Sequence, residues 1–547
     1  MIRIFGLINK NVPSCCKIST SGVDDGHKYL FENKDLLVIL QGNIFGVEED
    51  KPAEYISRKY VETKNMSFLK KINGSFNFII LDKLKKTIFI GTDKYGSIPL
   101  FIYQKNDTFF FASKIKFLLD MIGEEPTPNW KAWGEYLTFR FTLGEDTFYN
   151  GIKLVSNGTF FKIDYRKNIK VARKRYWDFS QIELDYKSSY EEKVLEGVEV
   201  FKKVFERLNK KIRRSKTLIA LSGGYDSRSI VSGLLKYSPS RTFDTITTLH
   251  PAGPEKDIVD KLCDKLHLSN IYIDRPINIY EKYYIQKEYL TDYLVQEHLW
   301  IMPMINTIRK YDAYIDGIAG DIVMRSTRVR PIHITKKDDS LFLSKLFKKQ
   351  FGFEYNWLKK YLDSNIWQKI KYTNKWVVNE LNGIPTTENR MTIFLMKNRV
   401  RNGISIASSN IIGDNVQTVL QPFFNDELMT FGLSIPHKYK FRFIYREIID
   451  RSFPEIKDIK STSDENLEKL KEYDKKILKF NQNPRELISD YSEISSQDKT
   501  YLLKLLNSLD FPPFINKLKF MNDINIDLKI NRVNTILDMV LWFNNYK

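Results

Sequence analysis

A polar corner between two apolar segments is the part of this sequence whose residue types could do chemistry. Residues 217–235 read TLIALSGGYDSRSIVSGLL. The run Thr217–Leu221 predicts a short buried strand, and the residues from Arg228 to Leu235 continue with apolar side chains at helical spacing. The corner between strand and helix consists of Ser222, Gly223, Gly224, Tyr225, Asp226 and Ser227.

The residue types in this corner are suited to binding phosphate. A glycine-rich turn that leads from a strand into a helix exposes backbone N–H groups at the positive end of the helix. Gly223 and Gly224 permit a positive φ and a close approach of the backbone to phosphate. Ser222 and Ser227 supply hydroxyl donors, and Asp226 can hold Mg²⁺ against the phosphate oxygens. The alternative is an ordinary turn whose polar residues cap the helix. The complete Ser-Gly-Gly-x-Asp-Ser string favours a phosphate site instead. This site does not have the Walker spacing, because no Gly-Lys-Ser/Thr follows.

Strands and helices alternate on both sides of this corner. This order predicts right-handed crossovers and a parallel sheet that is covered on both faces. In such sheets ligands bind beyond the carboxyl ends of the strands, which is where the corner lies. From about residue 335 the sequence predicts mostly helix. The expected helices span 194–212 and 255–266, and the further strands span 243–249, 270–274 and 312–317.

The first part of the chain instead predicts antiparallel β structure. Up to about residue 120, short β-branched or aromatic runs such as LLVILQGNIFG, FNFIILD and TFFFAS are separated by turn residues. Residues 128–139 predict a helix, and a hairpin follows that ends near residue 178. The polar stretch after the hairpin is the expected linker. We therefore expect two domains, 1–178 and 190–547.

Length, composition and cysteine content are typical of a cytoplasmic enzyme. The chain has 547 residues with 42% hydrophobic side chains, no apolar run long enough to cross a bilayer and no signal-peptide pattern at its start. Its three cysteines cannot build a disulfide framework, and its six histidines show no zinc-ligand spacing with them. The net charge of +19 is spread along the chain rather than concentrated in one arm. We therefore expect no membrane partner and no nucleic-acid partner.

The corner resembles the PP-loop of ATP pyrophosphatase-type enzymes, which cleave ATP to AMP and pyrophosphate. Residues 69–119 resemble the glutaminase-type domain of the asparagine synthetase family, with DKYGSIPLFIY at the position of that family's Arg-Asp-x-x-Gly-x-x-Pro-Leu-Tyr-Tyr stretch. Residues 144–164, GEDTFYNGIKLVSNGTFFKID, continue the resemblance, which extends to about residue 460. It implies an α/β fold with an N-terminal Ntn-hydrolase-like β-rich sandwich, followed by a doubly wound parallel sheet of the PP-loop type with a helical extension.

The same resemblance implies that the first domain has lost glutaminase activity. Family members often begin with Met-Cys, and this cysteine hydrolyses glutamine once the methionine is removed. In this sequence Ile2 stands at the nucleophile position, and an alkyl side chain cannot attack an amide. Cys15 and Cys16 lie too far along the chain to replace it, and Gln41 stands where the family's glutamine-binding stretch has asparagine. We expect a structural domain, or a platform for another partner.

For the second domain, the resemblance implies an ATP site with Mg²⁺ at the corner. Asp321 would supply a second carboxylate to the metal opposite Asp226. Glu255 matches an acidic residue that precedes a helix, which the helix dipole explains equally well. Lys460, with Lys457 close by, is the candidate for a lysine that stabilises the transition state, and a surface lysine is the alternative. The implied nucleotide-binding residues are Leu221, Ser222, Gly223, Gly224, Asp226, Ser227 and Gly317.

Several positions depart from the family pattern. Ile318 replaces a glutamate, Leu420 an arginine and Asn425 an aspartate, all where such enzymes hold their substrate. Arg228 replaces a serine beside the corner and adds positive charge there. The arginines of MKNRVRNG (396–403) can meet phosphate or a carboxylate, although exposed helical arginines commonly do neither.

The sequence therefore predicts an ATP-dependent amide ligase. A small-molecule or peptide carboxylate would be adenylated, and an amine other than glutamine-derived ammonia would then attack the acyl group. Relatives without the cysteine include β-lactam synthetases and the macrolactam cyclases of lasso peptides. An asparagine synthetase using free ammonia, a PP-loop tRNA-modifying enzyme and an inactive scaffold are the alternatives. The sequence leaves the carboxylate, the amine and the oligomeric state open.

Overall fold

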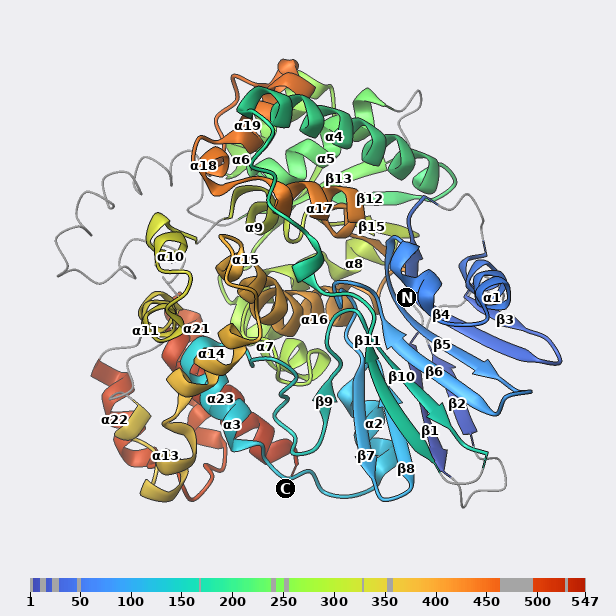
Figure 1. The fold of residues 1–547 in the computed structure, drawn as a ribbon. Coiled ribbons are helices and arrows are strands. Elements are labelled where there is room, and N and C mark those ends of the chain that lie inside the picture. Colours follow the sequence, from blue (N-terminus) through green and yellow to red (C-terminus); the bar gives the residue numbers. More distant parts are fainter. Residues whose placement is uncertain are drawn as a thin grey trace.

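Two antiparallel sheets and one parallel sheet form the framework of the molecule (Figure 1). The structure is a computed structural model. It describes residues 3–9, 16–21, 29–46, 51–166, 169–237, 243–249, 255–326, 329–351, 358–462, 495–526 and 530–546.

The antiparallel sheets pack face to face as a sandwich, which confirms the β-rich first part. Isoleucines and phenylalanines alternate along the strands and meet between the two sheets in a common core, so one face of each sheet lies in this core. One sheet has the order β2 (Cys16–Ser21), β1 (Arg3–Asn9), β8 (Thr108–Ala112), β7 (Phe101–Lys105) and β9 (Lys153–Leu154). The other has the order β11 (Lys170–Arg175), β10 (Thr159–Asp164), β6 (Thr87–Thr92), β5 (Gly74–Asp82), β4 (Leu36–Ile44) and β3 (Leu30–Glu32), with α1 (Pro52–Thr63) against its outer face.

The third sheet is parallel throughout, as the alternation of strands and helices predicts. Its order is β14 (Asn270–Asp274), β13 (Phe243–Leu249), β12 (Thr217–Ala220), β15 (Ala313–Ile315) and β16 (Thr418–Leu420). Ile219 of the central strand faces α4 (Tyr190–Ile212) and α5 (Tyr225–Lys236), whereas Leu218 faces the opposite layer of helical turns. Helices therefore cover both faces, and the α/β doubly wound arrangement is confirmed.

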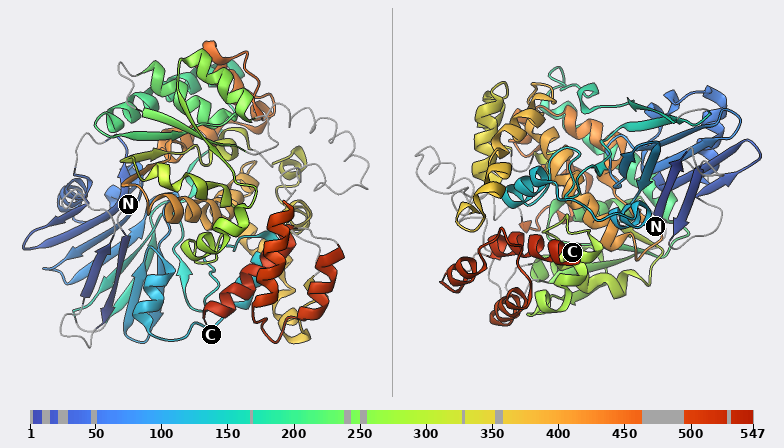
Figure 2. Two further views of the ribbon diagram at one scale, coloured as in Figure 1. Left: turned by 180° about the vertical axis from the view of Figure 1, so that it is seen from behind. Right: turned by 90° about the horizontal axis from the view of Figure 1, so that it is seen from below.

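From about residue 335 onward the described residues are mostly helical, as expected, apart from the strand β16. Figure 2 places the C-terminal helices, in red, at the end of the molecule away from the outer blue strands. Two segments of the helical part, Met396–Ile404 and Ser408–Ile412, are π-helical. The remaining helices are α2 (Ile115–Ile122), α3 (Trp130–Phe139), α6 (Glu255–Leu266), α7 (Ile279–Leu290), α8 (Ile305–Ile308), α9 (Gly320–Arg325), α10 (Pro331–Thr335), α11 (Ser340–Phe351), α13 (Ser364–Ile370), α14 (Thr373–Asn382), α15 (Arg390–Leu395), α16 (Ser405–Ala407), α17 (Asp426–Ser434), α18 (His437–Lys440), α19 (Ile444–Ser452), α21 (Ser496–Ser508), α22 (Lys517–Ile526) and α23 (Ile530–Asn545). No helix in the described ranges is both long enough and apolar enough to span a membrane.

The sandwich contacts the parallel sheet and the segment before β16 through polar groups. Arg3 of β1 donates from Nε to Oδ1 of Asp414 at 2.8 Å and from Nη1 to Oγ of Ser409 at 3.0 Å. Asn43 of β4 donates to the carbonyl oxygen of Val419 in β16 at 3.4 Å. The edge of the parallel sheet therefore lies against the sandwich.

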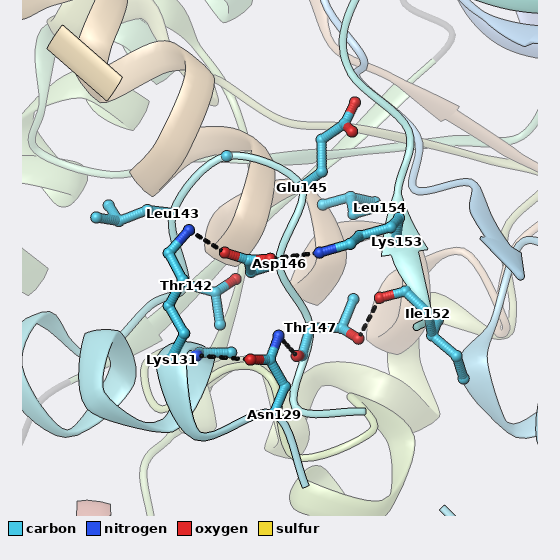
Figure 3. A network of polar contacts seen from close by, with 12 residues as sticks. Asn129, Lys131, Thr142, Leu143, Glu145, Asp146, Thr147, Ile152, Lys153 and Leu154 are labelled. Atoms are coloured by element: carbon cyan, nitrogen blue, oxygen red, sulfur yellow. Dashed lines mark hydrogen bonds and ion pairs between the residues drawn. The ribbon is translucent and has the colours of Figure 1, made fainter. Parts of the chain in front are cut away.

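A loop of the first part, residues 142–155, carries a second contact region (Figure 3). The carboxylate of Asp146 lies between two lysines and accepts hydrogen bonds from Nζ of Lys131 and Nζ of Lys153, both at 2.6 Å. The hydroxyl of Thr147 donates to the carbonyl oxygen of Ile152 at 2.9 Å, which closes the loop on itself. These contacts hold the loop's carbonyl groups in place for the helical segment that packs on it.

Two buried carboxylates connect α3, α7 and α23. Asp538 accepts hydrogen bonds from the hydroxyl of Tyr136 at 2.5 Å and from the hydroxyl of Tyr284. Glu288 pairs with Lys287, and all of these ionisable groups are buried. Burial and the nearby charge of Asp538 raise the pKa of Glu288 to about 8. Burial likewise raises the pKa of Asp538 to about 6.

Replacing Asp538 with asparagine should therefore reduce the pH dependence of stability. Between the ordinary pKa of 4.5 and the folded pKa of about 8, folded Glu288 holds a proton that the unfolded chain has lost. The free energy of unfolding consequently falls as pH rises through this window. Removing the Asp538 charge lowers the pKa of Glu288 and eliminates a second titration, so we expect this fall to be smaller by about 1 kcal/mol from pH 5 to pH 8. Urea unfolding at pH 5 and pH 8 measures this change in the free energy of unfolding. Asp510→Asn, at an exposed carboxylate, should leave the pH dependence of stability as it is in the wild type. An unaltered pH dependence in Asp538→Asn would contradict the assignment.

Candidate functional site

The corner of residues 221–227 lies at the carboxyl end of the central strand β12, as predicted. Leu221 is buried and continues the sheet, since its N–H donates to the carbonyl oxygen of Ile246 at 2.9 Å. Helix α5 begins at Tyr225 rather than near Arg228, so Tyr225 and Asp226 belong to its first turn. The corner therefore combines the open edge of a parallel sheet with the N-terminus of a helix.

The two serines of the corner are held against each other. The hydroxyl oxygens of Ser222 and Ser227 are 2.8 Å apart, and the backbone N–H of Ser222 donates to Oγ of Ser227 at 2.9 Å. The N–H of Gly224 donates to Oγ of Ser222 at 3.2 Å. These contacts hold the hydroxyl and N–H donors of the loop close together. A ligand that replaces the internal hydrogen bonds would therefore meet several donors at one place.

A carboxylate already lies on this loop. Glu255, the first described residue of α6, accepts a hydrogen bond at Oε1 from the N–H of Gly223 at 2.5 Å. An anionic oxygen at this N–H group is the contact that a phosphate oxygen would make. Glu255 lies in the first turn of α6, as the helix-dipole interpretation requires, and it also contacts the loop.

The glycines of the loop allow another part of the chain to approach the backbone closely, and neither of them has a positive φ. Neither Gly223 nor Gly224 has a positive φ, and Gly224 is extended with φ −78° and ψ 166°. A Cβ on Gly223 would lie 2.7 Å from Cγ2 of Thr462, whose N–H donates to the carbonyl oxygen of Gly223 at 3.1 Å. Of the two properties that glycine permits here, the structure uses the close approach, because the segment that follows residue 459 occupies the space beside Gly223.

Asp226 and Asp321 come together, as the resemblance implied. Oδ2 of Asp226 accepts a hydrogen bond from the N–H of Asp321 at 2.8 Å, and Oδ1 accepts one from the hydroxyl of Tyr445 at 2.9 Å. Burial and the negative charge of Asp321 raise the pKa of Asp226 to about 8. The close approach depends on two glycines: a Cβ would lie 3.0 Å from Cβ of Asp226 at Gly317 and 2.5 Å from its Cγ at Gly320.

Two adjacent carboxylates fit Mg²⁺ better than zinc. Mg²⁺ is commonly held by one or two carboxylates together with substrate phosphates and water. Within the described ranges, no group of three or more histidine, cysteine, aspartate or glutamate side chains is arranged to hold a metal. Asp226 and Asp321 therefore suit a metal that arrives with a phosphate ligand.

Arg228 does not offer its charge to a ligand. Its side chain is 1% exposed, and its guanidinium donates to the carbonyl oxygens of Gly223 at 2.8 Å, Ile459 at 2.8 Å, Lys460 at 3.1 Å and Gly224 at 3.2 Å. It clamps the corner to the 459–462 segment. This brings the backbone of Lys460 to the site, while the Lys460 side chain is exposed, as is that of Lys457.

The substituted positions take structural roles in this chain. Leu420 is buried in the apolar core beside α5, and Ile318 is half-buried against another apolar cluster. The side chain of Asn425 caps α17 by accepting the N–H of Glu427 at 2.9 Å. In the sandwich, Gln41 is buried and accepts a hydrogen bond from Asn77 at 3.0 Å.

Two predictions about the first domain concern positions that the structure leaves out. Ile2 and Cys15 lie outside the described residues, and Cys16 belongs to β2.

Sequence reasoning missed Tyr445, Gly320 and Arg325. Tyr445 reaches Asp226 from α19, and its position in FRFIYREII carries no signal beyond an aromatic residue in an amphipathic helix. Gly320 lies one residue before Asp321, and its spacing from Gly317 was the available signal. Arg325 follows Asp321 by one helical turn, and its guanidinium carbon lies 5.3 Å from the ring centroid of Tyr225.

Comparison with known proteins gives one domain match and several relatives of low identity. Residues 30–177 match the family model of the glutamine amidotransferase domain. Over 236 residues the chain is 27% identical to a putative glutamine-hydrolysing asparagine synthetase of Methanocaldococcus jannaschii, a match that covers 40% of this chain and 43% of the relative. It is 24% identical over 273 residues to asparagine synthetase 2 of Bacillus subtilis, covering 45% of this chain and 36% of the relative. The matches thus span less than half of each relative.

Among solved structures, one similar chain is the glutamine phosphoribosylpyrophosphate amidotransferase of B. subtilis. It is 10% identical, with 45% of this chain and 68% of that chain covered and a TM-score of 0.19. The chain therefore matches the glutamine amidotransferase domain over residues 30–177 and is similar, at low identity, to asparagine synthetases.

Proposed function

We propose that this protein is an ATP-dependent amide ligase that adenylates a substrate carboxylate. The observation that carries the proposal is the corner of β12 and α5, where a carboxylate lies on the N–H of Gly223 beside the paired acids Asp226 and Asp321. This edge offers backbone donors to phosphate and carboxylates to a metal at the same place. The relatives' names support the class of reaction.

Each residue of the corner has a defined part in this proposal. The N–H of Gly223 and the hydroxyls of Ser222 and Ser227 would bind phosphate oxygens of ATP, with the Glu255 carboxylate displaced from its hydrogen bond. Asp226 and Asp321 would hold Mg²⁺, which when bound supplies positive charge against the departing pyrophosphate. These donors stabilise charge that grows as the reaction proceeds.

The reaction converts a poor acyl donor into a good one. An oxygen of the substrate carboxylate attacks the α-phosphorus, and the bond to the bridging oxygen breaks with its electron pair leaving on pyrophosphate. An amine then attacks the acyl carbon, loses a proton and displaces AMP. Lys460 is proposed to stabilise negative charge during these steps, and its exposed side chain must turn toward the corner to do so.

The amine is proposed not to be ammonia released from glutamine. The side chain of Gln41, which replaces the family's asparagine, is committed to the interior of the sheet through its contact with Asn77. A first domain in which the Gln41 side chain occupies the position of the family's asparagine is better suited to a structural role. Asparagine formation from free ammonia is the alternative amide-forming reaction that the same corner would support.

Carboxylate-dependent exchange of labelled pyrophosphate into ATP tests the proposal. The full chain with Mg²⁺ and ATP should show exchange above background with at least one member of a panel of amino acids, dicarboxylic acids and short peptides, and the same preparation should not hydrolyse glutamine. Exchange without any carboxylate would indicate a different acceptor. Absence of both Mg-ATP binding and exchange would refute the ligase, and glutamine hydrolysis would refute the assignment of the front domain.

A further inference from the structure

Arg325 brings a positive charge to the same corner from a different element. It is the last residue of α9, on the helix face that also carries Asp321, since residues four apart lie on one face. The first turn of α9 contacts Asp226 through the N–H of Asp321 at 2.8 Å. The short helix therefore presents an acid and a guanidinium toward the end of β12.

The Arg325 guanidinium has no polar partner among the residues that the structure describes. Its contact is with the ring of Tyr225, 5.3 Å from the guanidinium carbon to the ring centroid, and Arg228 lies 5.4 Å from the same ring. A guanidinium over an aromatic face keeps its N–H donors free in the plane of the group. Arg325 is half-buried, so part of its side chain is exposed to solvent.

The two arginines at Tyr225 differ in what they can do. Arg228 donates to carbonyl oxygens on both sides of the corner, including Gly223 at 2.8 Å and Ile459 at 2.8 Å. Releasing it would break the contact between the corner and the following segment. Arg325 could take a new partner without losing any hydrogen bond, so it is the arginine that a ligand can use.

The charge of Arg325 acts on the space around Asp226. Burial and Asp321 raise the pKa of Asp226, and the positive charge of Arg325 is among the influences that lower it. Burial and Asp226 likewise raise the pKa of Tyr445, and Arg325 again lowers it. The guanidinium therefore lies close enough to influence both groups, yet it forms no ion pair with Asp226. A triphosphate bound at this corner would therefore lie near both the acids and the guanidinium.

We propose that Arg325 binds the pyrophosphate part of the triphosphate and stabilises it as a leaving group. Guanidinium groups pair with phosphate through two parallel hydrogen bonds, which suits the non-bridging oxygens of a diphosphate. When the carboxylate oxygen attacks the α-phosphorus and the bridging bond breaks, the electron pair and the negative charge pass to pyrophosphate. Arg325 meets this charge without donating a proton. The inference rests on the proposed ATP site and adds a residue to it.

Calorimetric titration of the full chain with three probes tests the assignment. The probes are Mg-pyrophosphate, Mg-ATP and AMP, applied to wild type, Arg325→Gln and Arg325→Lys. Arg325→Gln should weaken binding of Mg-pyrophosphate and Mg-ATP by about 10- to 100-fold and leave AMP binding within about twofold, while Arg325→Lys recovers part of the loss. Arg166→Gln, in an exposed ion pair with Asp164, should bind all three probes as the wild type does.

The outcomes separate this inference from the proposed function. Wild-type binding of Mg-pyrophosphate by Arg325→Gln would overturn the role of Arg325 and leave the ATP site standing. Equal weakening of AMP would overturn it as well, because the effect would then be on the whole pocket. Failure of the wild type to bind Mg-ATP and Mg-pyrophosphate would overturn both. Since Arg325 makes no hydrogen bond within the described chain, circular dichroism should show an intact fold in both variants.

Discussion

Asp226→Asn is expected to lower carboxylate-dependent pyrophosphate exchange by about 10²- to 10³-fold while the protein remains folded. An amide cannot supply the negative charge that holds Mg²⁺ beside the phosphates. It can still accept one of the two hydrogen bonds that Asp226 accepts, those from Tyr445 and from the N–H of Asp321. Mg-dependent ATP binding by calorimetry gives a second measurement that does not require the substrate carboxylate.

Stability should respond in the opposite direction to activity. The pKa of Asp226 is raised to about 8, chiefly by burial and by Asp321, so the folded protein resists ionisation of this carboxyl group. Between the ordinary pKa of 3.8 and about 8, the wild type loses stability as pH rises, and the asparagine variant does not. At pH 8 the variant should therefore unfold at an equal or higher urea concentration.

Two further variants control for this result. Asp321→Asn should lose exchange to a similar extent, because it removes the second carboxylate of the pair. Asp257→Asn, at an exposed position in the first turn of α6, should keep wild-type exchange. Full exchange by Asp226→Asn would remove Asp226 from the metal site, and loss of exchange in Asp257→Asn would show that the assay reports general damage.

The local part of this site could be predicted from the sequence because it is continuous in the chain. The strand, the turn and the helix of the corner lie within residues 217–236, and hydrophobic spacing together with glycine and serine chemistry specifies them. The sequence pattern places Tyr225 and Asp226 in the turn, whereas α5 already begins at Tyr225. Polar residues in a first helical turn are common, so composition alone does not separate a cap from a loop.

The long-range part of the site could not be predicted, because it depends on contacts between distant segments. Tyr445 reaches Asp226 across 219 positions, and Thr462 lies beside Gly223. Arg228 is a second example. From the sequence, an arginine in place of the family's serine is predicted to add positive charge to the corner. In the structure, carbonyl oxygens surround this side chain. Whether a cation serves a ligand or the backbone is decided by its neighbours in space.

Arg401→Met is expected to destabilise the protein by about 3 kcal/mol, because the buried guanidinium holds two parts of the chain together. Arg401 lies in the π-helical segment Met396–Ile404 and is 4% exposed. Its guanidinium donates to the carbonyl oxygen of Val155 at 2.7 Å and to that of Gly144. The sequence predicts that this arginine can meet phosphate or a carboxylate, whereas the structure places its guanidinium against the 142–155 loop of the first part.

The neighbouring Arg399 provides the matched control for this prediction. It belongs to the same π-helical segment, but its side chain is more exposed and pairs with Glu297 at 2.9 Å, so Arg399→Met should cost less than about 1 kcal/mol. Arg401→Lys should lose at least half as much stability as Arg401→Met, because one ammonium group cannot reach both carbonyl oxygens. Urea unfolding and the calorimetric melting temperature measure these differences. Equal loss in Arg399→Met and Arg401→Met would show that the contact with the 142–155 loop contributes nothing specific. A large loss confined to Arg401 would show that the contact with the 142–155 loop stabilises the π-helical segment, which gives the first part of the chain a structural role.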